Sequence, residues 1–350
     1  MAVCAVGADD TMATFDRRII MTQFSILDLA PIKQGSNATE ALQNCLDLAQ
    51  HAEVFGFERF WVAEHHNMQG IASAATAVVI GHVANGTSRI RIGSGGIMLP
   101  NHSPLVIAEQ FGTLASLYPD RIDLGLGRAP GTDQITSHAL RRTLHGSAED
   151  FPRDVIELQQ YFAEPEEGQK VMAVPGAGTH VPLWILGSSL FGAQLAAMLG
   201  LPFAFASHFA PAQMLQAIEL YREGFKPSAQ LAQPYLMMGY NICAGESLEE
   251  AEYLRTSSLQ SFLNLRRGKP SQLPPPIKNF EKQLTREDEM LLSQMGRCSA
   301  IGALPEIKSE MAEFISLTGA DELILTSSIY DHSKRLRSFE IAAEAGHSIK

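Results

Sequence analysis

The stretch Arg59–Asn67 changes from apolar to ionisable side chains within a few positions. Residues 60–63 are apolar, and Glu64, His65 and His66 follow at once. A buried parallel strand is a continuous apolar run, and barrel enzymes carry their functional side chains at the carboxyl ends of such strands. Histidine titrates near neutral pH, so this cluster suits general acid–base chemistry. The pattern therefore predicts an enzyme.

Metal ligation and a structural role are the alternatives for the same cluster. Adjacent histidines on a strand point to opposite sides, so His65 and His66 are poorly placed to chelate one ion together. The other predicted strand ends carry no HxH or Asp-rich motif that would complete a metal site. We expect proton transfer and no metal, and keep a metal-dependent hydrolase built on Glu64, His65 and His66 as a rival interpretation.

Two further strand ends carry groups that suit an anion. Arg128 follows a glycine-rich strand, and a cation at such a rim favours anion binding over an ordinary surface role. Gly187, Ser188 and Ser189 open a predicted helix, whose free amides and positive dipole end form a natural phosphate seat. A capping serine without a ligand is the alternative.

Glycines interrupt one of the predicted strands, 90–99, at Gly93, Gly95 and Gly96. Glycine weakens a strand unless another group must approach the backbone closely or the backbone adopts an unusual dihedral angle. We therefore expect close approach of a ligand at Gly95 and Gly96, with a simple bulge as the alternative.

Apolar strands alternate with helices along the chain. The predicted strands are 24–29, 60–63, 90–99, 121–127, 181–186, 203–206, 235–243 and 322–326. Helices are predicted over 39–55, 71–84, 104–117, 149–162, 189–199, 211–221 and 333–345, with another that begins at Ser247 as N-cap. This alternation predicts an α/β fold, a (β/α)₈ TIM barrel. A doubly wound sheet is the runner-up, but the first strand lacks a glycine-rich dinucleotide turn.

Two segments fall outside the alternation. Residues 264–300 contain Arg266–Pro270 and Pro274–Pro276, which cannot form a regular helix, so we expect an inserted loop or lid before the last strand. Residues 1–20 lack the basic start and apolar segment of a secretory signal, and we expect them to be a disordered extension. The remainder, 21–350, is predicted to be a single domain.

Composition limits the classes of partner. The 350 residues are 45% hydrophobic and 19% charged, with a net charge of −11, which argues against nucleic acid and anionic membrane surfaces as partners. No apolar run approaches the roughly 18 residues that cross a bilayer. The four cysteines follow no metal or disulfide spacing, which predicts free thiols in a reducing compartment. We expect a cytoplasmic protein.

With these residues in view, the chain resembles the bacterial-luciferase-like family of flavin-dependent monooxygenases. The resemblance runs from Phe24 to about Phe339 and is carried by four motifs at successive strand ends, at 61–66, 92–100, 124–128 and 184–189. It implies a TIM barrel that binds FMN.

The resemblance also implies a set of site residues. It places the catalytic histidine at His65, and a non-proline cis peptide between two glycines beneath the isoalloxazine ring. The luciferases carry a reactive cysteine just before the arginine that binds phosphate, and Gly127 stands there in this chain. The cofactor-binding residues that we expect are Asp28, Glu64, Gly95, Gly96, Arg128, Gly187, Ser188 and Ser189.

The activity implied is that of an FMN-dependent monooxygenase acting on paired donors. Reduced FMN from a separate flavin reductase and O₂ would oxygenate a small organic substrate, which the sequence does not identify. His65 would manage protons, the 264–300 insertion would close over the flavin ring, and the protein would be a homodimer. A deazaflavin-dependent hydride-transfer enzyme and a non-catalytic flavin-binding protein are the alternatives.

Overall fold

The structure is a computed structural model that describes residues 22–128, 136, 139–140, 149–293 and 298–349. The extension predicted over 1–20 lies outside the described residues. None of the helices in these ranges combines the length and the apolar character that crossing a membrane would require.

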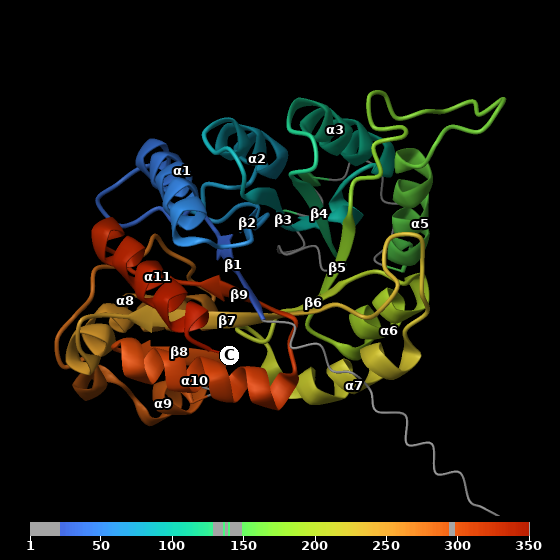
Figure 1. Cartoon of the computed structure of the whole chain (residues 1–350). Helices are drawn as coiled ribbons and strands as arrows, with labels where there is room; N and C mark the ends of the chain where they lie inside the picture. Colours follow the sequence, from blue (N-terminus) through green and yellow to red (C-terminus); the bar gives the residue numbers. More distant parts are fainter. Residues whose placement is uncertain (1–21, 129–135, 137–138, 141–148, 294–297, 350) are drawn as a thin grey trace, which may run out of the picture.

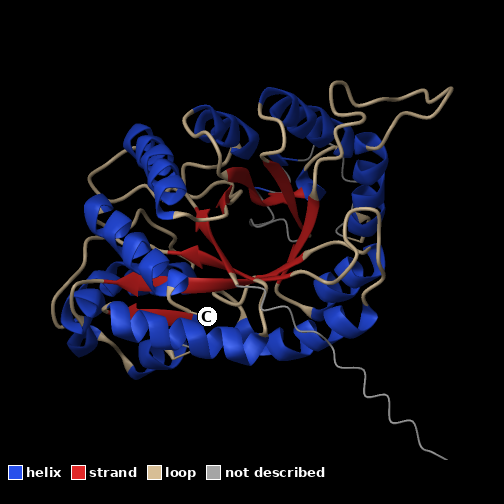
Figure 2. Ribbon diagram, viewed as in Figure 1, coloured by secondary structure: helices blue, strands red, loops and turns tan. Residues whose placement is uncertain are grey.

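Eight parallel strands close into a barrel, as predicted (Figures 1 and 2). The barrel order is β1-β2-β3-β4-β5-β6-β7-β9, and β9 pairs back to β1; Ile26 of β1, for example, lies opposite Phe60 of β2 and Leu325 of β9. The barrel strands are β1 Gln23–Asp28, β2 Arg59–Val62, β3 Arg91–Met98, β4 Ile122–Gly127, β5 Leu183–Gly187, β6 Phe203–Phe205, β7 Leu236–Ala244 and β9 Glu322–Thr326.

Helices surround the strands, which Figure 2 shows as a blue ring around red strands. They are α1 Ala38–Phe55, α2 Thr76–Asn85, α3 Pro104–Leu117, α5 Phe151–Phe162, α6 Leu190–Leu199, α7 Met214–Gly224, α8 Leu248–Arg266, α9 Arg286–Leu292, α10 Leu304–Thr318 and α11 His332–His347. Ser247 caps α8, as predicted, by accepting a hydrogen bond from the Glu250 N–H. The predicted helix over 71–84 is wrong at its start, because the chain first forms a bridge at Ile71 before α2 begins.

The segment between β7 and β9 carries more regular structure than a loop. The prediction for 264–300 is wrong in this respect, since the segment contains α9 and ends in β8, Ser299–Gly302. β8 pairs with Asn241–Ala244 of β7, outside the barrel, while β9 pairs with 237–241. The sequence of β8, SAIG, has only two adjacent apolar side chains, Ala300 and Ile301, which is too little for a strand pattern. The helix α10 that follows it was missed.

The beginning of the insertion is fastened to the loop that follows β1. The N–H of Leu273 donates to the carbonyl of Ile32 (2.9 Å), and the N–H of Gln34 donates to the carbonyl of Leu273 (2.8 Å). A Cβ at Gly70 would lie 2.4 Å from the carbonyl oxygen of Ser271, so these two backbones are in close contact. The insertion therefore covers the carboxyl end of β1.

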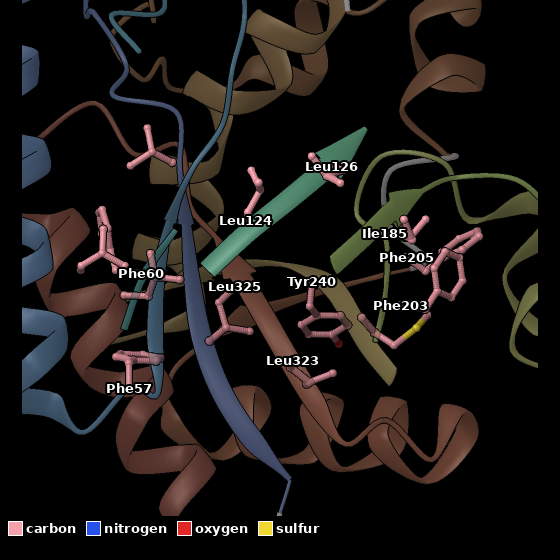
Figure 3. Close-up of a cluster of buried hydrophobic side chains, with 14 of the residues drawn as sticks. Phe57, Phe60, Leu124, Leu126, Ile185, Phe203, Phe205, Tyr240, Leu323 and Leu325 are labelled. Atoms are coloured by element: carbon pink, nitrogen blue, oxygen red, sulfur yellow. The ribbon is translucent and has the colours of Figure 1, made fainter. Parts of the chain in front are cut away.

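Apolar side chains fill two separate regions, because neighbouring strand residues point to opposite faces. Phe60, Phe203, Leu323 and Leu325 belong to the large cluster between strands and helices (Figure 3). The barrel lumen holds a second cluster, Leu27, Trp61, Ala63, Trp184, Ala204, Met237 and Ile324. The rings of Trp61 and Trp184 meet edge to face at 5.1 Å, and both side chains are buried in the core.

A buried ion network closes the amino-terminal end of the lumen. Arg59 forms ion pairs with Asp123 (2.9 Å) and Glu322 (2.8 Å). Trp61 Nε1 donates to Asp123, and the Tyr235 hydroxyl donates to Glu322. Burial acts to lower the pKa of Arg59, but the two carboxylates outweigh it and raise the pKa. The charged plug leaves the carboxyl ends of the strands as the accessible end of the barrel.

Candidate active site

Glu64 is the centre of a hydrogen-bonded group at the end of β2. Its side chain is buried, and Oε1 accepts from Nε2 of His66 (2.7 Å) and Nε2 of His102 (2.8 Å). The N–H of Met98 donates to Oε2 at 3.2 Å. Burial acts to raise the pKa of Glu64, but the bonds from His102, His66 and Met98 outweigh it and lower the pKa. Glu64 is thus a carboxylate at neutral pH that fixes two imidazole rings.

His102 was missed by the sequence interpretation. It lies between β3 and α3, and its contact with Glu64 spans 38 positions in the chain. The donor atoms of Glu64, His66 and His102 lie within 4.8 Å of one another, and the residue types match a catalytic zinc set. The metal interpretation had instead assigned His65 to this group. The distances from Oε1 of Glu64 to Nε2 of His66 and to Nε2 of His102 are those of direct hydrogen bonds.

His65 lies apart from this group. Among the described residues, its Nδ1 is buried and has no hydrogen-bond partner. Burial lowers the pKa of His65, while Glu64 acts in the opposite direction. The ring is therefore neutral near pH 7 and has one nitrogen free to accept or donate a proton.

The peptide between Gly95 and Gly96 is cis, as the resemblance implied. The register of β3 with β4 also shifts between Ser94 and Ile97. A Cβ at Gly96 would lie 2.7 Å from the carbonyl oxygen of Gly125, and one at Gly95 would lie 2.5 Å from Leu27 Cδ1. Glycine is thus required at both positions because β3 lies close to β4 and to the lumen. The glycines of this strand therefore have a packing cause, in addition to the approach of a ligand that we expected.

Arg128 and the start of α6 lie next to each other. β4 and β5 are neighbours, and the guanidinium of Arg128 stacks on the ring of Phe191 in α6 at 4.1 Å from its centroid. Arg128 and Ser188 are exposed, and the N-cap Ser189 makes no side-chain capping hydrogen bond. A cation therefore lies beside the N-terminus of a helix at the barrel rim.

Asp28 lies at the end of β1 and is fully buried. One of its oxygens binds Nη2 of Arg335 from α11 at 2.5 Å, and the other has no partner among the described residues. Nε of Arg335 donates to the carbonyl of Ser327 at 2.9 Å. Asp28 thus positions Arg335. The predicted contact of Asp28 with a cofactor would have to be made by its second oxygen.

A cavity of about 240 Å³ lies beside this site. Its walls come from the ends of β1, β7 and β9, from β8 and from α8, and the 270–273 segment forms its roof. The sequence interpretation did not foresee this cavity, because its walls belong to elements far apart in the chain.

The sequence model of the luciferase-like monooxygenases matches residues 22–321. The chain belongs to this family. It is 54% identical over 321 residues to a luciferase-like monooxygenase of Escherichia coli strain K12, which covers 92% of this chain and 96% of that protein. It is 29% identical over 332 residues to an N-acetyl-S-alkylcysteine monooxygenase of Bacillus subtilis strain 168, covering 93% and 98%.

Solved structures agree with the family assignment. The crystal structure of apo-MsnO8 has a TM-score of 0.83 at 32% identity, covering 94% of this chain and 99% of that one. The oxygenating constituent of 3,6-diketocamphane monooxygenase from Pseudomonas putida, solved with FMN, shares the fold at 16% identity (TM-score 0.70; 94% and 99% covered). So does the F420-dependent tetrahydromethanopterin reductase of Methanopyrus kandleri (16%; TM-score 0.64; 93% and 98% covered).

In this member of the family, most of the predicted site residues fall into two groups, and Asp28 lies at the end of β1, next to the first group. Glu64, His65 and the cis peptide lie at the ends of β2 and within β3, and Arg128 and residues 187–189 lie at the ends of β4 and β5. These strands are consecutive in the barrel, so both groups border one side of its mouth. Their roles in binding and catalysis stay predictions.

Proposed function

We propose that the protein is an FMN-dependent monooxygenase, which uses reduced FMN and O₂ to oxygenate a small organic substrate. The observation that carries this proposal is the pairing of Arg128 with the uncapped N-terminus of α6. A terminal phosphate between them would receive one charged donor and several helix amides.

The residues beside this seat fit the rest of a flavin. Gly95 and Gly96 present a stretch of strand without side chains, against which a planar ring would pack. Asp28 and Glu64 lie at the neighbouring strand ends, where they would border the ring. When bound, the reduced flavin would supply the electrons that activate O₂.

His65 would hold and move a proton at Nδ1, the atom that has no partner in the described part of the chain. Glu64, fixed by His66 and His102, would hold the end of β2 in place and so orient His65. Because the lumen behind this site is filled by Trp61 and Trp184, water would reach it only from the mouth of the barrel.

Three features of the wider system belong to the same proposal. A separate flavin reductase would supply reduced FMN, and the protein would act in the cytoplasm. It would be a homodimer through its early helices, where Val78 of α2 and Val106 of α3 are exposed (73% and 45%). The name of the Bacillus relative, an N-acetyl-S-alkylcysteine monooxygenase, supports a small organic substrate.

A deazaflavin-dependent hydride transfer is the second candidate, since an F420-dependent reductase shares the fold. The absorption spectrum of the cofactor that copurifies with the protein separates the two. An FMN spectrum supports the proposal, and a deazaflavin spectrum contradicts it.

Comparing FMN with riboflavin tests the phosphate seat. We expect FMN to bind at least ~10²-fold more tightly, because riboflavin leaves the charged donor and the amides unpaired. Arg128→Met should remove most of that preference and leave riboflavin affinity nearly unchanged. Fluorescence titration measures both constants, with Arg153→Met on α5, an arginine with 73% side-chain exposure, as the control. Equal affinities for the two flavins in the unmodified protein would mean that the seat is misplaced.

A further inference from the structure

The cavity beneath the 270–273 segment contains polar groups that the proposed flavin chemistry does not use. Three of its lining residues, Arg255, Ser258 and Ser261, follow one another at intervals of three along α8 and therefore lie on one face of that helix. Ser327, just after β9, lines it as well. No aspartate or glutamate is among the residues of the described chain that line it.

Arg255 is a partly buried cation without a counter-ion. Among the described residues, its guanidinium makes no hydrogen bond or ion pair; Glu310 and Glu252 act on it only at longer range. Burial lowers the pKa of Arg255, which nevertheless stays charged at neutral pH. The other arginine that lines the cavity, Arg335, is fully engaged with Asp28 and the carbonyl of Ser327.

Two hydroxyl groups of the cavity are also unused. The Oγ atoms of Ser261 and Ser327 are buried and have no hydrogen-bond partner in the described part of the structure. Buried polar groups are normally paired, so unpaired donors on the wall of a cavity are available to a molecule that occupies it. Phe262, Leu265 and Leu273 supply an apolar wall and roof.

We propose that this cavity binds the substrate of the enzyme through a carboxylate group, which pairs with Arg255 while the remainder of the molecule lies against the apolar wall. A carboxylate accepts two parallel N–H bonds from a guanidinium and still has lone pairs for the serine hydroxyls. The claim that this carboxylate ligand is the molecule that is oxygenated rests on the proposed function. The claim that the cavity binds a carboxylate does not rest on it.

Octanoate and its neutral analogue octanamide are the probes, with binding measured by calorimetry on the FMN-loaded protein. We expect octanoate to bind at least ~10-fold more tightly than octanamide, because a desolvated ion pair replaces a neutral hydrogen bond. Arg255→Met should reduce the preference to about twofold or less, and Arg255→Lys, which keeps the charge but loses the two parallel bonds, should retain only part of it. Thermal unfolding establishes that each variant is folded, and Arg255→Gln is a second neutral variant if the methionine protein does not fold.

Two control variants locate the binding. In flavin-free protein, Arg128→Met must leave the octanoate preference unchanged, since otherwise the anion occupies the phosphate seat and the cavity proposal falls. Arg153→Met must leave it unchanged because that arginine is exposed on α5. Equal affinity for the two probes, or a preference that survives in the neutral Arg255 variants, would also overturn the proposal.

The same measurements on flavin-free protein separate this proposal from the proposed function. An octanoate preference that depends on Arg255 in a protein that fails to bind FMN would support the carboxylate site and contradict the monooxygenase. FMN binding without any octanoate preference would contradict only the carboxylate site.

Discussion

At the scale of single residues, two neighbouring histidines have opposite environments. His66 is held by an ionised Glu64, whereas His65 has a buried ring nitrogen without a partner in the described chain. The sequence predicted different surroundings for the two rings from strand alternation, but β2 ends at Val62 and both histidines lie in the loop beyond it. The partnership of Glu64 with His102 could not be predicted, because it joins two different strand ends.

We expect His65→Ala to reduce oxygenation of the substrate by about 10²–10⁴-fold, the usual contribution of general acid–base catalysis. FMN affinity should change little, since the phosphate seat lies two strands away. Turnover with saturating reduced FMN measures the first effect, and flavin titration measures the second. His82→Ala, an exposed histidine on α2, is the control. Unchanged turnover in the His65 variant would remove this residue from the mechanism.

At the scale of elements, the strand–helix alternation could be predicted because both patterns are local. The apolar run of β2 and the Ser247 cap of α8 each need only a few neighbouring residues. The short strand β8 could not, because its pairing with the second half of β7 is what makes it a strand. α10 did have a signal, since Ile307, Met311, Phe314 and Thr318 are buried at helical spacing.

The contact between β3 and β4 gives a stability prediction. A Cβ at Gly125 would lie 2.1 Å from the carbonyl oxygen of Ser94, whereas one at Gly127 would meet no atom closer than 3.8 Å. Gly125→Ala should therefore lower the free energy of unfolding by about 1–3 kcal/mol, the usual cost of overpacking. Gly127→Ala should change it by less than about 0.5 kcal/mol. Urea unfolding compares the two, and equal effects would contradict the packing argument.

At the scale of the whole molecule, charge is buried at one end of the barrel, and the predicted site residues lie at the other. The family, the barrel and the line of polar strand ends could be predicted, since they depend on motifs. The plug of Arg59, Asp123 and Glu322 and the unpaired Arg255 could not, because each depends on which side chains meet across the folded barrel.

The pH dependence of global stability should carry a contribution from His208. Burial lowers its pKa to about 4, and its Nδ1 has no partner among the described residues. Unfolded, the ring titrates near 6.5, so between these values the unfolded chain binds the additional proton. Stability therefore falls as pH decreases from about 6.5 to 4, by up to about 3 kcal/mol.

His208→Gln should remove this part of the pH dependence, and His82→Gln, on the surface of α2, should not. The measurement is the difference between variant and unmodified protein in the free energy of unfolding at pH 7 and pH 4.5. If the free energy of unfolding changes by the same amount between pH 7 and pH 4.5 in the His208 variant and in the unmodified protein, His208 is not responsible for this part of the pH dependence.

Arg255, the proposed partner of the carboxylate, and the apolar residues Phe262, Leu265 and Leu273 come from one uninterrupted piece of chain. The residues proposed to hold FMN come from β1 to β5 and the start of α6, earlier in the chain. Under the proposed function, insertions, deletions or exchange of that single later segment should therefore change the shape and charge of the cavity and leave the residues proposed to hold FMN in place. One change to the gene would then alter which molecule is oxygenated while the oxidant stays the same.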